Sequence, residues 1–204
     1  MKLALRRLVV GGLLALWAGC GGAPQSDLPT YHPSAAASKA LAEFDRNNDG
    51  LLDAAELDQS PGLKSAVPRI DKNGDQKLSA GEISERVAYY RDTRTGFMGV
   101  PLTITLSGQP LRGAEVMLTP ESCLVDEIQA ATGTTGVVGV VAPKIPASEF
   151  SGVSPGVYRL SISLKDPAGK ETLPGKYNTA TTLGLEVAPD VPGLERGVRF
   201  DLTK

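Results

Sequence analysis

The sequence contains one histidine, two cysteines and few aromatic residues, and each shortage excludes a kind of function. With His32 alone, a Ser-His-Asp or Cys-His catalytic arrangement is implausible. Two cysteines, Cys20 and Cys123, build neither a disulfide framework nor a zinc-spaced Cys/His set. No P-loop and no G-x-S-x-G segment occurs either. The sequence therefore predicts a protein that is not an enzyme and has no catalytic residues.

An excess of charge of one sign is also missing. The chain has 21 basic and 23 acidic residues and a net charge of −2. Nucleic-acid binding requires a strongly basic surface, so it is not expected. The hydrophobic fraction of 41% is sufficient for a globular protein.

The N-terminus has the pattern of an export signal. Lys2, Arg6 and Arg7 precede an apolar run, residues 8–18, which is too short for a helix of about 20 residues that crosses a bilayer. Residues 1–19 are therefore predicted to be a signal peptide. Residues 20–34 combine Gly, Pro and polar residues without periodicity, which indicates a flexible tether in which His32 is solvated.

The segment Ala18-Gly19-Cys20 resembles the lipobox of bacterial lipoproteins. This resemblance implies that Cys20 is lipidated and anchors the mature chain to a membrane of the bacterial cell envelope, on its periplasmic or surface side. Trp17 stands where the family usually has Leu, so an ordinary signal peptide cut nearby remains the alternative.

Two acidic segments of the same design follow the tether, Asp45–Glu56 and Asp71–Glu82. Each has oxygen-bearing side chains at positions 1, 3, 5 and 9 and ends with Glu at position 12. Calcium takes six to eight oxygen ligands, and a loop coiled around the ion presents an oxygen at about every second residue. The spacing therefore predicts two calcium sites.

The two loops resemble the EF-hand, which implies the ligand set of each site. The expected ligands of the first loop are Asp45, Asn47, Asp49, the carbonyl of Leu51, Asp53 and Glu56. The expected ligands of the second loop are Asp71, Asn73, Asp75, the carbonyl of Lys77, Ser79 and Glu82. The alternative is a pair of polar turns that bind no metal.

One position separates the two loops. Gly50 occupies position 6 of the first loop, whereas Gln76 occupies it in the second. A residue with a side chain costs on the order of 1 kcal/mol in the left-handed conformation expected there. The first site, which also has more carboxylates, is therefore predicted to bind calcium more tightly.

Apolar periodicity predicts helices on both sides of each loop. A helix over Ser34–Phe44 should enter the first loop, and its exit helix should stop near Pro61-Gly62. The helix entering the second loop should be short or kinked at Pro68. Leu52 and Leu78, at the eighth loop positions, are expected to connect the two loops by backbone hydrogen bonds.

Beyond Gly96, short apolar alternations are separated by Gly and Pro turns, which predicts an antiparallel β-sandwich. The candidate strands are 100–106, 114–118, 128–131, 137–141, 157–164, 183–187 and 198–202. Cys123 is expected to be a buried apolar residue. The nearby acidic residues Glu115, Glu121, Asp126 and Glu127 are expected to be solvated rather than to form an acid-base couple.

The segments Pro110–Pro120, Thr132–Val137, Gly152–Ile162 and Leu173–Asn178 resemble the carboxypeptidase regulatory-like, or transthyretin-like, domain. That family implies an Ig-like sandwich, most often an accessory module of a secreted or surface protein. A shared fold does not determine the function of such a module.

Together these patterns predict an α+β protein of two domains, an α-helical EF-hand pair over 35–95 and an all-β sandwich over 96–204. The expected function is a calcium-binding, lipid-anchored envelope protein with a structural or interaction module. One alternative is a dockerin-like module that docks onto an envelope protein. Another is a surface protein that binds a ligand or polysaccharide.

Overall fold

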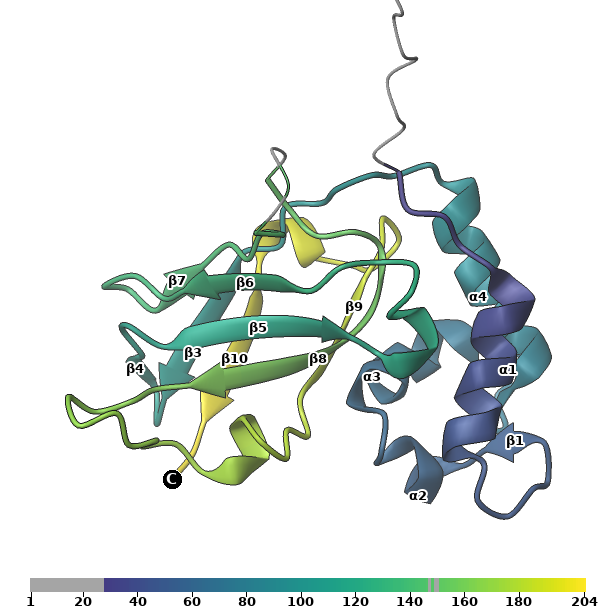
Figure 1. Cartoon of the computed structure of the whole chain (residues 1–204), viewed down its shortest axis with the longest axis horizontal. Helices are drawn as coiled ribbons and strands as arrows, with labels where there is room; N and C mark the ends of the chain where they lie inside the picture. Colours follow the sequence, from purple (N-terminus) through teal and green to yellow (C-terminus); the bar gives the residue numbers. More distant parts are fainter. Residues whose placement is uncertain (1–27, 147, 149–150) are drawn as a thin grey trace, which may run out of the picture.

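The computed structural model describes residues 28–146, 148 and 151–204. The predicted signal peptide, Cys20 and most of the predicted tether lie outside the described residues. Of the helices within the described ranges, none has both the length and the apolar character that crossing a membrane requires. Helices and strands are both present and are largely separated along the chain, so the fold is α+β (Figure 1).

The helical part contains four helices and one small two-stranded sheet between residues 33 and 92. Its elements are α1 (Pro33–Phe44), β1 (Leu51–Leu52), α2 (Ala54–Leu57), α3 (Pro61–Ile70), β2 (Leu78–Ser79) and α4 (Ala80–Asp92). Each predicted calcium loop therefore lies between two helices, with a short strand near its end.

The predicted tether extends too far toward the C-terminus. Helix α1 begins at Pro33, because proline is well suited to the first turn of a helix. Tyr31 is buried, and its hydroxyl donates a hydrogen bond of 2.5 Å to the carbonyl of Pro155. The His32 side chain is 65% exposed, as expected, but its backbone N–H donates to Glu127 Oε1. Residues 31–34 are thus part of the folded structure.

The exit helix of the first loop is shorter than predicted. It ends at Leu57, and Pro61, expected to stop it, is the first residue of the next helix. The same property of proline explains both positions, since a missing N–H is harmless in the first turn. Pro68 does not interrupt α3, which continues to Ile70.

The β part extends from residue 102 to 202 and forms two four-stranded sheets. Its strands are β3 (Leu102–Leu106), β4 (Gln109–Pro110), β5 (Glu115–Pro120), β6 (Ala131–Thr134), β7 (Val140–Val141), β8 (Gly156–Ser163), β9 (Gly184–Val187) and β10 (Val198–Leu202). Short 3₁₀ turns lie at Ser122–Leu124, Gly175–Tyr177 and Leu194–Arg196.

One sheet has the order β6-β5-β8-β9 and is antiparallel throughout, as predicted. In the other sheet β3 pairs with β4 and β7 in antiparallel fashion but with β10 in parallel. The prediction of a purely antiparallel arrangement was therefore wrong for this pair. Parallel neighbours need a long crossover connection, and nearly the whole β part separates β3 from β10.

The predicted strand over 128–131 is also wrong at its start. Ile128 follows the 3₁₀ turn Ser122–Leu124, and its N–H donates to the carbonyl of Leu124 rather than to a neighbouring strand. The strand begins instead at Ala131, where Thr132 pairs with Met117. The strand was extended to Ile128 because this residue is apolar. Its apolar character is equally consistent with the buried position that it occupies after the 3₁₀ turn.

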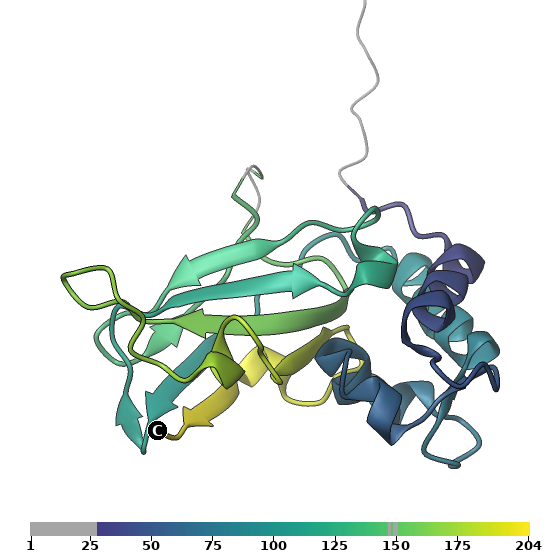
Figure 2. The same ribbon diagram turned by 60° about the horizontal axis from the view of Figure 1, so that its bottom comes forward.

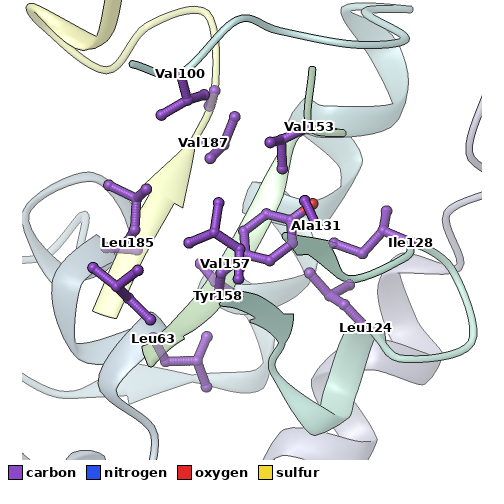
Figure 3. Close-up of a cluster of buried hydrophobic side chains, with 14 of the residues drawn as sticks. Leu63, Val100, Leu124, Ile128, Ala131, Val153, Val157, Tyr158, Leu185 and Val187 are labelled. Atoms are coloured by element: carbon purple, nitrogen blue, oxygen red, sulfur yellow. The ribbon is translucent and has the colours of Figure 1, made fainter. Parts of the chain in front are cut away.

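The helices lie at one end of the two sheets, and α3 packs directly on β8 and β9 (Figures 1 and 2). Leu63 of α3 joins a buried cluster that contains Val157 of β8 and Leu185 of β9 (Figure 3). Helix α1 also contacts the turn Ser122–Leu124. The helical and β parts therefore pack against each other through one buried cluster. The boundary near Gly96 stays a prediction.

Candidate metal centre

The loop Asp45–Glu56 is coiled by hydrogen bonds from its own backbone to its acidic and amide side chains. Asp45 Oδ2 accepts the N–H of Gly50 at 3.0 Å, and Asn47 Oδ1 accepts the N–H of Asp49 at 2.7 Å. Asp49 Oδ1 accepts the N–H of Leu51 at 2.9 Å. The side chains at positions 1, 3 and 5 are thus turned toward the concave side of their own loop.

The loop Asp71–Glu82 repeats these bonds at the same positions. Asp71 Oδ2 accepts the N–H of Gln76 at 2.9 Å, Asn73 Oδ1 accepts that of Asp75 at 2.9 Å, and Asp75 Oδ1 accepts that of Lys77 at 2.8 Å. The two sequences therefore form the same turn, although position 6 is Gly in one loop and Gln in the other.

Both loops require left-handed backbone at two positions. At position 6, φ is +82° for Gly50 and +61° for Gln76. At position 4, Asn48 and Gly74 have φ of +58° and +79°. The conformation expected at Gln76 is present, and it is one that a residue with a Cβ adopts at a cost.

Strands β1 and β2 connect the loops. They pair in antiparallel fashion, with Leu52 opposite Leu78 and Leu51 opposite Ser79. Leu52 and Leu78 are both fully buried, so the apolar eighth positions attach the loops to the helical core. The predicted backbone connection between the loops is confirmed.

Position 9 of each loop is also the N-cap of the exit helix. Asp53 Oδ1 accepts the N–H groups of Ala55 and Glu56, and Ser79 Oγ accepts the N–H of Glu82. In return Glu56 and Glu82 accept the N–H of Asp53 and Ser79. These reciprocal capping boxes start α2 and α4 immediately beside the loops.

The closing glutamates contact the backbone as well. Glu56 Oε1 accepts the N–H of Arg46 at 2.8 Å, and Glu82 Oε1 accepts that of Lys72 at 3.0 Å. Burial raises the pKa of Glu82, but the hydrogen bonds from Ser79 and Lys72 outweigh it and hold that pKa below its ordinary value. Glu82 thus lies against the start of its own loop as an anion, and Glu56 makes the equivalent backbone contact in the first loop.

Asp45 Oδ1 is buried and has no hydrogen-bond partner among the residues that the structure describes. A buried carboxylate oxygen without a partner is costly, because nothing replaces the water that it loses. A cation in the first loop would remove this cost, and the oxygen comes from position 1, where a calcium ligand is expected. The donor set of the first loop therefore fits a hard cation.

In the second loop the corresponding oxygen, Asp71 Oδ1, accepts the N–H of Gly74 at 2.7 Å. In the ranges 28–146, 148 and 151–204, no three His, Cys, Asp or Glu side chains are grouped closely enough to hold a metal ion. The loop donors include amide, hydroxyl and carbonyl oxygens, and Glu56 and Glu82 are bonded to the backbone. In each loop the expected metal ligands therefore lie on the inner side of the turn, but three carboxylates are not gathered at one point.

A lysine connects the two loops electrostatically. Lys77 Nζ lies 3.7 Å from Asp49 Oδ2, and both side chains are partly exposed. The N–H of Leu51, the Asn47 amide and Lys77 lower the pKa of Asp49, with the Leu51 bond contributing most. Asp49 is therefore an anion at neutral pH.

Two acidic residues expected to be solvated have side chains that are shielded from solvent. Glu121 is fully buried, bonded to Gly62 N–H at 2.6 Å and Arg159 Nε at 2.9 Å. Burial raises its pKa above the ordinary value, although Arg159 opposes the shift. The Glu127 side chain is 4% exposed. The prediction was wrong for both, because their partners come from segments distant in the sequence.

Glu186, a buried carboxylate on β9 between the buried residues Leu185 and Val187, was not predicted from the sequence. Its partners Arg69, Arg86 and Tyr90 all lie in the helical part. A charge inside an apolar strand was the available signal, since buried acids require partners. Burial of Cys123, by contrast, was predicted and is confirmed.

Comparison of the chain with protein-family models, curated proteins and solved structures finds no match in any of the three.

Proposed function

We propose that this chain is a calcium-binding protein in which an EF-hand pair holds one ion in each of the loops Asp45–Glu56 and Asp71–Glu82. The observation that carries the proposal is the buried, unpartnered Asp45 Oδ1 inside a loop whose other donors are already turned inward. The repetition of the same turn in the second loop supports it.

The residues that would hold the ions are the donors predicted from the spacing, with Leu51 and Lys77 contributing carbonyl oxygens. A bound calcium ion would supply positive charge among carboxylates that otherwise repel one another. Glu56 and Glu82 would exchange backbone N–H contacts for the ion, because a bidentate ligand uses both of its oxygens.

The β part is proposed to be a non-catalytic structural or interaction module of the transthyretin-like kind. Its two four-stranded sheets and its buried alternation along β5 and β8 support this. The N-terminal pattern adds export and a lipid anchor at Cys20, which would attach the protein to a cell-envelope membrane. Its partner would then be an envelope protein.

The dockerin-like alternative is less well supported than the EF-hand. Dockerin modules tend to lack the helix that enters the first loop, whereas α1 extends over Pro33–Phe44. Polysaccharide binding needs exposed aromatic side chains. Among the described residues none of the large exposed apolar side chains is aromatic, which gives this alternative little support.

Calorimetric titration of residues 21–204 with calcium tests the proposal. The wild type should take up two ions, Glu56→Gln and Glu82→Gln one each, and the double variant none, because glutamine is not a bidentate carboxylate ligand. Glu195→Gln is the matched control and should bind two, because the Glu195 side chain is 73% exposed and forms an ion pair with its chain neighbour Arg196. Full calcium uptake by the double variant would rule out the proposed sites.

A further inference from the structure

The buried carboxylate of Glu186 on β9 is gripped by both helices that flank the second loop. Arg69 Nε, from α3, donates to Glu186 Oε2, and Arg86 Nε, from α4, donates to Oε1. The Tyr90 hydroxyl, also from α4, donates to Oε1 at 2.6 Å. Glu186 is 1% exposed, so these contacts are shielded from solvent.

Arg69 and Arg86, which bond Glu186, lie close in sequence to the second loop. Arg69 is in the last turn of α3, just before Asp71, and Arg86 lies one turn after Glu82. Asp71 and Glu82 are the first and last expected ligands of the second loop. The β part therefore contacts both helices that flank this loop through a single side chain.

Arg86 is fixed further by a second acid. Its Nη1 and Nη2 each donate to Asp190 at 2.7 Å, and its guanidinium lies 4.7 Å from the centre of the Tyr89 ring. A bidentate Arg–carboxylate pair restricts direction as well as distance. The orientation of α4 against β9 is thus set by Glu186 and Asp190 together.

The other end of α3 is also held by the β part. Glu121 accepts the N–H of Gly62 near the N-terminus of the helix, and Arg159 bonds both Glu121 and the carbonyl of Gln59. A carboxylate at a helix N-terminus interacts favourably with the helix dipole. By contrast, both side chains of the ion pair Lys39–Asp126, which joins α1 to the β part, are exposed to solvent. Such a pair contributes little energy and therefore does little to fix the orientation of α1.

We propose that the β part sets the calcium affinity of the second loop, with Glu186 as the positioning residue that holds α3 and α4. This inference rests on the calcium function proposed above. A loop whose flanking helices are already held needs less ordering when the ion arrives, and preorganisation of this kind strengthens binding. Coupling between sites is reciprocal, so calcium in the second loop also strengthens the contact between α3, α4 and the β part.

The test separates the two loops. Glu56→Gln leaves the second loop as the only complete site, and Glu82→Gln leaves the first. Adding Glu186→Gln should weaken calcium binding about fivefold or more in the Glu56→Gln background, the lower end of common coupling effects. In the Glu82→Gln background the affinity should be unchanged. Equal weakening in both backgrounds, or none in either, would overturn the proposal.

A second variant covers the case in which Glu186→Gln does not fold. Tyr90→Phe removes one hydrogen bond to Glu186 and keeps the aromatic ring. It should weaken calcium binding by the second loop only, and by a smaller factor than Glu186→Gln does. Thermal unfolding in chelator and in calcium provides an independent measurement. If Glu186 has a purely structural role, the variants should lower the melting temperature in chelator and the melting temperature in calcium by the same amount. If Glu186 is coupled to calcium binding, the rise in melting temperature on calcium addition should be smaller in the variants than in the wild type.

The exposed Glu195 again gives a control, since Glu195→Gln should change neither loop. If the wild type takes up no calcium, the proposed function and this inference both fail. If the wild type binds two ions but Glu186→Gln and Tyr90→Phe leave the second loop as tight as before, only this inference fails.

Discussion

Gly184 on β9 lies against the carbonyl oxygen of Pro61 at the start of α3 so closely that a Cβ at Gly184 would be 1.8 Å from that oxygen. Gly62 is also constrained, although less severely, because its Cβ would be 2.7 Å from Glu121 Cγ and 2.9 Å from the backbone nitrogen of Tyr158. The two parts of the chain therefore meet backbone to backbone at this point.

Gly184→Ala should destabilise the protein by about 1–3 kcal/mol or more, because the added methyl group overlaps backbone atoms that cannot rotate away. Gly99→Ala is the matched control, since a Cβ there meets nothing within 4 Å. Urea unfolding of both variants measures the difference. Equal stability of the two would show that α3 does not approach β9 this closely.

Gln76→Gly should tighten the second calcium site by about 1 kcal/mol at most, because glycine adopts the left-handed conformation at +61° without the cost of a Cβ. Titration in the Glu56→Gln background isolates this site. The reverse change, Gly50→Gln, should weaken the first loop in the Glu82→Gln background. A weaker second site in Gln76→Gly would contradict the strain argument.

Cys123 should resist thiol reagents in the folded protein. Burial, with a smaller contribution from the charge of Glu121, raises the pKa of its thiol to about 12, whereas the pKa of an unperturbed cysteine is about 8.5. Because the folded pKa is the higher one, the contribution of this thiol to stability is complete below about pH 8.5 and is lost as the pH rises toward about 12.

Residues 21–204 contain Cys123 as their only cysteine, so labelling with a disulfide reagent at pH 8 and pH 9 reports on it alone. Little labelling is expected before unfolding and complete labelling in denaturant. Rapid labelling of the native protein at pH 8 would show that the thiol is accessible.

Cys20→Ser should abolish lipid attachment of the exported chain. A single acyl chain gives marginal membrane binding, and two or more give stable anchoring. Metabolic lipid labelling and membrane fractionation of the wild type and the variant check this, with Cys123→Ser as the control that keeps its lipid. Equal lipid labelling of Cys20→Ser and the wild type would show that the lipid is not attached at Cys20. Absence of labelling in both would show that the chain carries no lipid.

Most of the helical part was predictable from the sequence because its determinants are local. The helices flanking the loops follow apolar periodicity and capping residues such as Asp53 and Ser79, which act within a few positions. Errors occurred where one residue type has two local roles. Pro61 was expected to end a helix and begins one, and Ile128 was assigned to a strand although it follows a 3₁₀ turn.

The sequence alone determined how the acidic loops coil, because their side-chain oxygens accept hydrogen bonds from backbone N–H groups of the same loop. The parallel pairing of β3 with β10, the grip of Arg69 and Arg86 on Glu186 and the close contact of Gly184 with Pro61 were decided only by the tertiary structure. These contacts join segments that are far apart in the chain. No local pattern marks such partners, because a buried charge shows that a partner is required but not where it lies.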